Sequence, residues 1–147
     1  LCNKLNPDNE SGRLTLSIRM GIDNIKQHLP RIIKALKKEG IKVILSCDPM
    51  HANTKKTKNG YKTRLFEDII SEVKSFFEIC SDEGFFAGGI HLEMSGDDVT
   101  ECTGSISANI QELDLANRYE TQCDPRLNAK QALELAFTIA QHLKQKS

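Results

Sequence analysis

Imidazole, carboxylate and guanidinium side chains occur near the ends of predicted strands, where parallel strands would bring them together. Arg19 ends the first predicted strand, His51 follows the second, and Glu93 ends the third. Asp124 lies in a polar segment ahead of the last predicted helix. A histidine with two carboxylates suits a borderline divalent metal such as manganese, iron, cobalt or zinc, whereas calcium prefers oxygen ligands alone. The sequence therefore predicts a divalent-metal site formed by His51, Glu93 and Asp124.

Two further residues are predicted to serve this site. His91 is expected on the same face of its strand as Glu93, because alternate residues of a strand point the same way, and we expect it to orient the metal ligands. Arg19 has a planar fork that fits a carboxylate or a phosphate. Purely structural roles remain open for three of these residues. Arg19 could form a salt bridge, His51 could be a hydrogen-bonding loop histidine, and Asp124 could be a turn former.

Strands are predicted to alternate with helices along the chain. Residues 13–19 alternate polar and apolar side chains, residues 42–46 form an apolar run typical of a buried parallel strand, and a third strand is expected at 87–94. Apolar residues at helical spacing predict helices over 22–38, 66–80 and 128–143. The remaining segments, 1–12, the basic stretch 55–62 and the polar stretch 95–126, are interpreted as loops.

Local signals define several of the expected helix ends. Asn128 followed by Gln131 predicts a capping box for the last helix, and Thr63 is the expected cap of the helix before it. Pro30 should kink the first helix or mark its true beginning.

This alternation predicts an α/β fold with parallel strands joined by right-handed crossovers. Three strands make a thin sheet, and one of them has a polar face that needs a covering layer. We therefore interpret residues 1–147 as a single partial domain, the closing three βα units of a TIM (β/α)8 barrel, in which active-site residues lie at the carboxyl ends of the strands.

Composition limits the classes of partner. Twenty basic residues balance twenty acidic ones, so no broad positive field indicates a nucleic-acid or membrane-surface binder. No apolar run has the length of a membrane span, and a cytoplasmic or organelle-matrix location is expected. The five cysteines lack the CxxC spacing of a zinc site, and we expect mostly free thiols, with Cys47 and Cys123 sensitive to oxidation if exposed.

Several motifs resemble, in order and spacing, the carboxy-terminal half of class II (plant-type) 3-deoxy-D-arabino-heptulosonate 7-phosphate (DAHP) synthases. These motifs are 18–21 (IRMG), 48–54 (DPMHANT), 88–94 (GGIHLEM), 97–102 (DDVTEC) and 123–128 (CDPRLN).

The resemblance implies condensation of phosphoenolpyruvate with erythrose 4-phosphate, the first step of the shikimate pathway, with manganese as the expected metal. By motif position, His51, Glu93 and Asp124 match three of the four metal ligands of the family, and Arg19 matches an arginine that holds phosphoenolpyruvate. The fourth ligand, a cysteine, and the other phosphoenolpyruvate-binding residues of the family precede residue 1. The resemblance therefore implies that the chain needs an amino-terminal barrel segment as its partner, is inactive alone, and belongs to a homo-oligomer; a plant-like source would place it in the plastid.

Two other functions stay open from the residues themselves. An unrelated metal-dependent lyase or aldolase on a small α/β fold would need no additional strands. A non-enzymatic metal-binding or interaction module would melt cooperatively as a monomer without binding dyes that detect exposed apolar surface.

Overall fold

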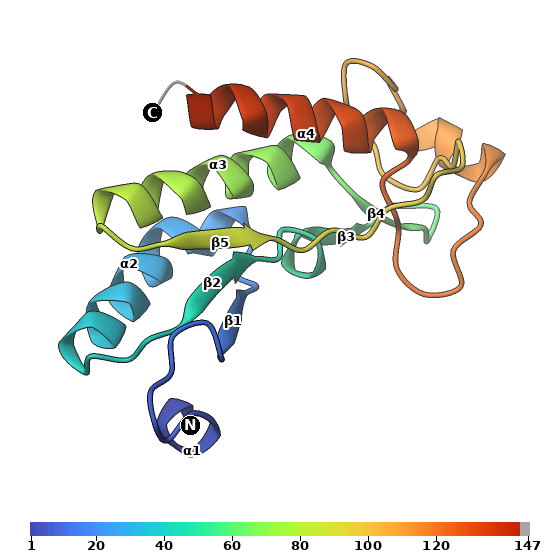
Figure 1. Cartoon of the computed structure of the whole chain (residues 1–147). Helices are drawn as coiled ribbons and strands as arrows, with labels where there is room; N and C mark the ends of the chain where they lie inside the picture. Colours follow the sequence, from blue (N-terminus) through green and yellow to red (C-terminus); the bar gives the residue numbers. More distant parts are fainter. Residues whose placement is uncertain (145–147) are drawn as a thin grey trace.

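The computed structural model describes residues 1–144, which contain a parallel sheet packed against helices (Figure 1). The sheet has the strand order β1-β2-β5 and consists of β1 (Thr15–Ile18), β2 (Ile44–Cys47) and β5 (Ala87–Ile90). Ile18 pairs with Cys47, and Cys47 pairs with Ile90, so the carboxyl ends of the strands lie level with one another. The α/β class and the parallel pairing predicted from the sequence are confirmed.

Three long helices follow the three strands. They are α2 (Ile22–Lys38), α3 (Phe66–Asp82) and α4 (Ala129–Lys144). Helices α2 and α3 share a core with one face of the sheet, whereas α4 lies along α3 (Figure 1). The main core is formed by Ile18, Ile25, Leu29, Ile33, Leu36, Leu45, Cys47, Val73, Phe76 and Cys80.

The strand β1 shows why the sequence pattern alternates. Leu16 and Ile18 turn towards the helices, whereas Thr15 and Ser17 on the opposite face are exposed. The helices thus cover one face of this strand and leave its polar face accessible.

The segments interpreted as loops contain more structure than expected. Residues 1–12 include a short helix, α1 (Cys2–Leu5), and the basic stretch forms an antiparallel hairpin of β3 (Thr54–Lys56) and β4 (Lys62–Arg64). Two short 3-10 helices, η1 (His51–Asn53) and η2 (Glu112–Asn117), occur in the connections. The hairpin escaped prediction because its strands are only three residues long and mostly polar.

The predicted helix ends are partly right. Asn128 and Gln131 exchange side-chain to backbone hydrogen bonds of 3.0 and 3.2 Å, so the capping box is confirmed. Thr63 as a helix cap is wrong, because it lies in β4 and its hydroxyl donates to the carbonyl of Glu101. Pro30 lies inside α2 and does not mark its beginning. The third strand ends at Ile90, four residues earlier than expected.

Within residues 1–144, no helix has both the length and the apolar character that crossing a bilayer requires. The five cysteines are free; Cys123 is exposed, whereas Cys47 is buried and burial raises the pKa of its thiol. Cys47 therefore does not meet the exposure condition for oxidation, and Cys123 does.

Candidate metal centre

Three predicted ligands converge beyond the carboxyl ends of the strands. One donor atom each from His51, Glu93 and Asp124 lies within 4.8 Å of the others, and all three side chains are partly buried. His51 Nε2 is 3.1 Å from Glu93 Oε1. These residues come from segments far apart in the chain, so the folded backbone must hold each segment in place.

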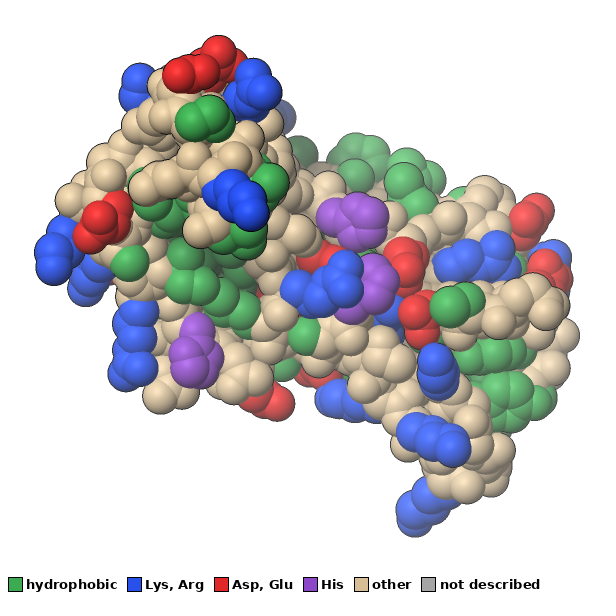
Figure 2. All heavy atoms as spheres, turned by 90° about the horizontal axis from the view of Figure 1, so that it is seen from below, with side chains coloured by type: hydrophobic (Ala, Val, Ile, Leu, Met, Phe, Trp, Pro, Cys, Tyr) green, Lys and Arg blue, Asp and Glu red, His purple; other side chains and the backbone are tan. Residues whose placement is uncertain are grey.

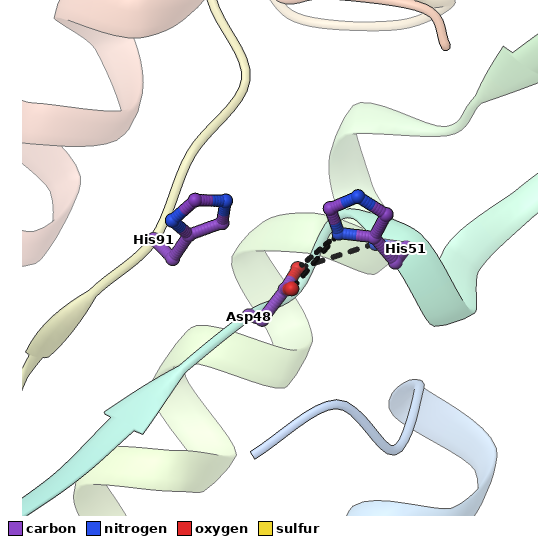
Figure 3. A group of neighbouring side chains, drawn as sticks. All are labelled: Asp48, His51 and His91. Carbon is purple, nitrogen blue, oxygen red and sulfur yellow. Dashed lines mark hydrogen bonds and ion pairs between the residues drawn. The ribbon is translucent and has the colours of Figure 1, made fainter. Parts of the chain in front are cut away.

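His51 is oriented by Asp48, which directly follows β2. The His51 Nδ1 atom lies 2.8 Å from Asp48 Oδ2. Dashed lines in Figure 3 mark the contacts between these two residues. The same carboxylate accepts the backbone N–H groups of Met50 and His51. Burial alone would raise the pKa of Asp48, but the hydrogen bonds from His51 and Met50 outweigh burial and lower it. An ionised Asp48 therefore fixes the imidazole through Nδ1 and leaves Nε2 facing Glu93.

Arg19 follows β1 and meets the same carboxylate. Its Nε atom donates to Asp48 Oδ2 at 2.9 Å, and about half of its side chain is exposed. The salt bridge considered as an alternative for Arg19 is thus present. The terminal nitrogens of the guanidinium make none of the hydrogen bonds found among the described residues, so they keep donor capacity for an anion.

Glu93 is held by a buried arginine that the sequence did not identify. Arg64, at the end of β4, has no exposed side-chain area and donates from Nη1 to Glu93 Oε2 at 2.5 Å. Nothing in the local sequence predicts this contact, because Arg64 lies between a basic loop and a helix, where most arginines are solvated.

Asp124 is brought to Glu93 by backbone pairing. Leu127 donates its N–H to the carbonyl of Glu93 at 3.0 Å and accepts from Ser95 at 2.8 Å, as in a parallel strand pair. The carboxylate of Asp124 also pairs with Lys62 at 3.3 Å. Slight burial opposes ionisation of Asp124, but the hydrogen bond from Lys62 prevails and lowers its pKa.

His91 lies beside His51 and Asp48, as Figure 3 shows. Its ring stacks against that of His51 with a centroid separation of 6.1 Å. Because β5 ends at Ile90, the strand alternation that was expected to align His91 with Glu93 does not extend this far. His91 is exposed, and its ring nitrogen lies near His51 and Asp48 rather than near Glu93. This position suits an orienting role towards His51.

The surroundings of the site are open and mixed in charge. Figure 2 shows histidine side chains next to acidic and basic ones in the middle of the face seen from below. A pocket of about 350 Å³ includes Glu93, Asp124 and Arg126 in its lining. A small anionic molecule entering this pocket would meet two of the candidate ligands, Glu93 and Asp124, and one cationic side chain, Arg126.

A second network missed from the sequence fixes the loops that carry Arg19 and His51. Glu72 of α3 is fully buried and accepts the N–H of Gly21 at 2.9 Å and the side-chain amide of Asn53 at 2.6 Å. Asn53 in turn accepts the N–H of Ile22. Burial raises the pKa of Glu72. This network ties the start of α2 to η1, so the backbone positions of Arg19 and His51 depend on each other.

The donor set fits a divalent cation. One imidazole nitrogen and two carboxylate oxygens suit manganese, iron, cobalt or zinc. The atoms that would not bind the cation, His51 Nδ1 and Glu93 Oε2, are hydrogen-bonded to Asp48 and Arg64. Such a cation would supply a Lewis acid able to polarise a carbonyl group.

The sequence of the chain is similar to those of known proteins. The sequence model of the class-II DAHP synthetase family matches residues 1–140. The chain is 51% identical over 141 residues to phospho-2-dehydro-3-deoxyheptonate aldolase AroG of Mycolicibacterium smegmatis, covering 96% of the chain. It is 49% identical over 138 residues to phospho-2-dehydro-3-deoxyheptonate aldolase of Streptomyces coelicolor, covering 94% of the chain. In both cases the chain spans 30% of the length of the relative.

Proposed function

Because the chain belongs to the class-II DAHP synthetase family, we propose that it supplies most of the metal centre of a DAHP synthase. The enzyme condenses phosphoenolpyruvate with erythrose 4-phosphate and water, and gives DAHP and phosphate. This reaction is the first step of the shikimate pathway. The observation that carries the proposal is the convergence of His51, Glu93 and Asp124, whose donor atoms lie within 4.8 Å of one another.

The three βα units form the closing part of a TIM (β/α)8 barrel in this proposal. The level carboxyl ends of β1, β2 and β5, and the position of every candidate site residue beyond them, support this assignment. The exposed polar side chains of β1 would then face the barrel interior. The other strands and the remaining ligand come from the part of the protein that the relatives have and this chain does not span, in an enzyme that assembles as a homo-oligomer.

Each residue has a defined task. His51, Glu93 and Asp124 bind the cation, with manganese as the proposed metal and cobalt, iron or zinc as substitutes. Arg19, held by Asp48 through Nε, directs its terminal nitrogens to phosphoenolpyruvate and neutralises its negative charge. His91 stacks on His51 and restricts the rotation of its ring. Holding both substrates beside the cation provides orientation and stabilises the charge that develops on the aldehyde oxygen.

Consumption of phosphoenolpyruvate tests this function. The chain is expressed within its complete natural coding sequence and supplied with erythrose 4-phosphate and Mn²⁺. We expect loss of phosphoenolpyruvate that requires both the sugar phosphate and the metal, and that falls to background in His51→Ala.

The matched control is His28→Ala, because His28 is an exposed histidine of α2. This variant should keep wild-type activity. A folded, metal-loaded wild-type protein that consumes no phosphoenolpyruvate would refute the proposed function.

A further inference from the structure

Arg64 is a buried charge at the centre of the chain's polar network. Its backbone pairs with Thr54 across the β3–β4 hairpin, and its carbonyl accepts the N–H of Thr103 at 3.0 Å. Helix α3 begins two residues later, at Phe66. The position of the side chain is therefore fixed from three sides, and its burial is costly unless the guanidinium has partners.

The partners of Arg64 lie in the segments that carry the three candidate ligands. Its Nε donates to Thr54 Oγ1 at 3.1 Å, three residues after His51. Its Nη1 donates to Glu93 Oε2 at 2.5 Å and also to the carbonyl of Pro125, the residue after Asp124. Two of its three nitrogens make these bonds, whereas Nη2 has no partner among the described residues. One planar group thus contacts all three ligand-bearing segments.

This arrangement assigns different tasks to the two oxygens of Glu93. Oε2 is occupied by Arg64, whereas Oε1 lies 3.1 Å from His51 Nε2 and belongs to the cluster of donor atoms. The Nδ1 atom of His51 is occupied in the same way by Asp48. His51 and Glu93 are therefore each held by one atom and offer the other.

We propose that Arg64 is a positioning residue that holds Glu93 and the turn at Asp124–Pro125 for cation binding, so that Glu93 offers only Oε1. This inference rests on the metal site of the proposed function. It requires the fork shape of the guanidinium, because the bonds to Thr54 and to Glu93 and Pro125 come from two separate nitrogens, Nε and Nη1, of one rigid plane. Charge alone does not achieve this, and a positive charge beside the cation site would by itself weaken cation binding.

Replacement of Arg64 by lysine separates shape from charge. Arg64→Lys keeps the positive charge, but its single nitrogen must replace both Nε, which bonds to Thr54, and Nη1, which bonds to Glu93 and Pro125. Loss of a residue that orients a metal ligand typically costs about 10–100-fold in metal affinity. We expect Arg64→Lys to bind Mn²⁺ weaker by that factor and to alter the electron paramagnetic resonance spectrum of the bound ion. The matched control is Arg118→Lys, because Arg118 forms an exposed ion pair with Glu120.

The proposal is tested by titrating Mn²⁺ into the protein expressed from its complete natural coding sequence, with electron paramagnetic resonance as the readout. Wild-type affinity and spectrum in a folded Arg64→Lys protein would overturn the proposal, because charge alone would then suffice. If Arg64→Lys does not fold, the decision passes to Thr54→Val, which removes the acceptor of Nε and, with it, a long hydrogen bond of 3.5 Å from the Thr54 hydroxyl to the carbonyl of Met50. A folded Thr54→Val protein should bind Mn²⁺ about two- to tenfold more weakly, as expected for one lost hydrogen bond, and unchanged affinity would overturn the proposal.

The titration does not depend on the reaction. A wild-type protein that binds Mn²⁺ but consumes no phosphoenolpyruvate would refute the proposed function, while the Arg64 comparison would still be decisive. A wild-type protein that binds no Mn²⁺ would overturn both.

Discussion

Residues 14–90 and residues 91–128 achieve order by different means. The first region buries apolar side chains between the sheet and the helices α2 and α3. The second also buries Val99, Cys102 and Leu115, but the buried carboxylate of Glu101 connects its segments by hydrogen bonds. Glu101 accepts two hydrogen bonds from the guanidinium of Arg126 and one from its backbone N–H. The first region depends mainly on packing, whereas the second adds the buried charge pair of Glu101 and Arg126. Because the pKa of Glu101 is lowered, the stability contributed by this pair is lost only as the pH falls below the ordinary value of 4.5.

The two regions also position the candidate site residues in different ways. In the first region the packed sheet, together with the buried hydrogen bonds of Glu72, positions Arg19 and His51. The second region must place Asp124 beside Glu93 across a long irregular segment. Buried apolar side chains fix the position of a strand by packing against their neighbours. They cannot fix a turn that has few apolar residues. Buried polar bonds with defined directions perform that task in the second region.

The largest effect is expected in the packed region. Phe76 is fully buried, and Phe76→Ala should lower the free energy of unfolding by about 3–5 kcal/mol because it leaves a cavity. Phe76→Leu keeps most of the volume and should cost less than about 1.5 kcal/mol. Urea unfolding measures both values. Equal losses in the two variants would contradict packing as the source of stability.

A smaller effect is expected when a buried carboxylate of the second region is neutralised. Burial would raise the pKa of Glu101, but the hydrogen bonds from Arg126 prevail and lower it. Glu101→Gln should therefore lower the free energy of unfolding by about 2 kcal/mol, a value kept modest because Arg126 is partly exposed to solvent.

The matched control is Glu78→Gln. Glu78 is an exposed residue of α3, and its replacement should change the free energy of unfolding by less than about 0.5 kcal/mol. Urea unfolding of both variants makes the comparison, and equal effects would contradict the role assigned to charge in the second region.

The smallest effect is a response to acid at Glu134 of α4. Burial opposes its ionisation, but hydrogen bonds from Ser107, Ser105 and the backbone of Ile106 lower its pKa from 4.5 to about 2. Because the folded-state pKa lies below the ordinary value, the charge stabilises the fold at neutral pH, and this contribution is lost as the pH falls from 4.5 towards 2. Amide resonances of Ile106 and Ser107 should titrate near the lower value. A midpoint at the ordinary value would contradict the prediction.

The sequence was most informative in the packed region. The apolar spacing of α2 and α3 reports directly on burial, because a helix with one apolar stripe has one stable orientation. The capping box of Asn128 and Gln131 was predictable for a related reason, since its two partners are three residues apart. Local patterns and local bonds determine these features.

Long-range polar contacts were not predictable. Arg64 bonds to partners 29 and 61 residues away, and Glu72 bonds to Gly21 across 51 residues. No periodic pattern reveals such pairs, because one polar residue can bond to any of many partners. His51, Glu93 and Asp124 were proposed as a set from their chemistry and from resemblance, whereas the residues that hold them became visible only in the folded chain.

The most direct measurement of the metal centre is an anomalous difference map at the manganese edge, from crystals of the protein grown with Mn²⁺. We predict one strong peak within bonding distance of His51 Nε2, Glu93 Oε1 and a carboxylate oxygen of Asp124, with Glu93 Oε2 still bound to Arg64. A peak elsewhere, or no peak at these three side chains in well-ordered crystals, would contradict the assignment of the site.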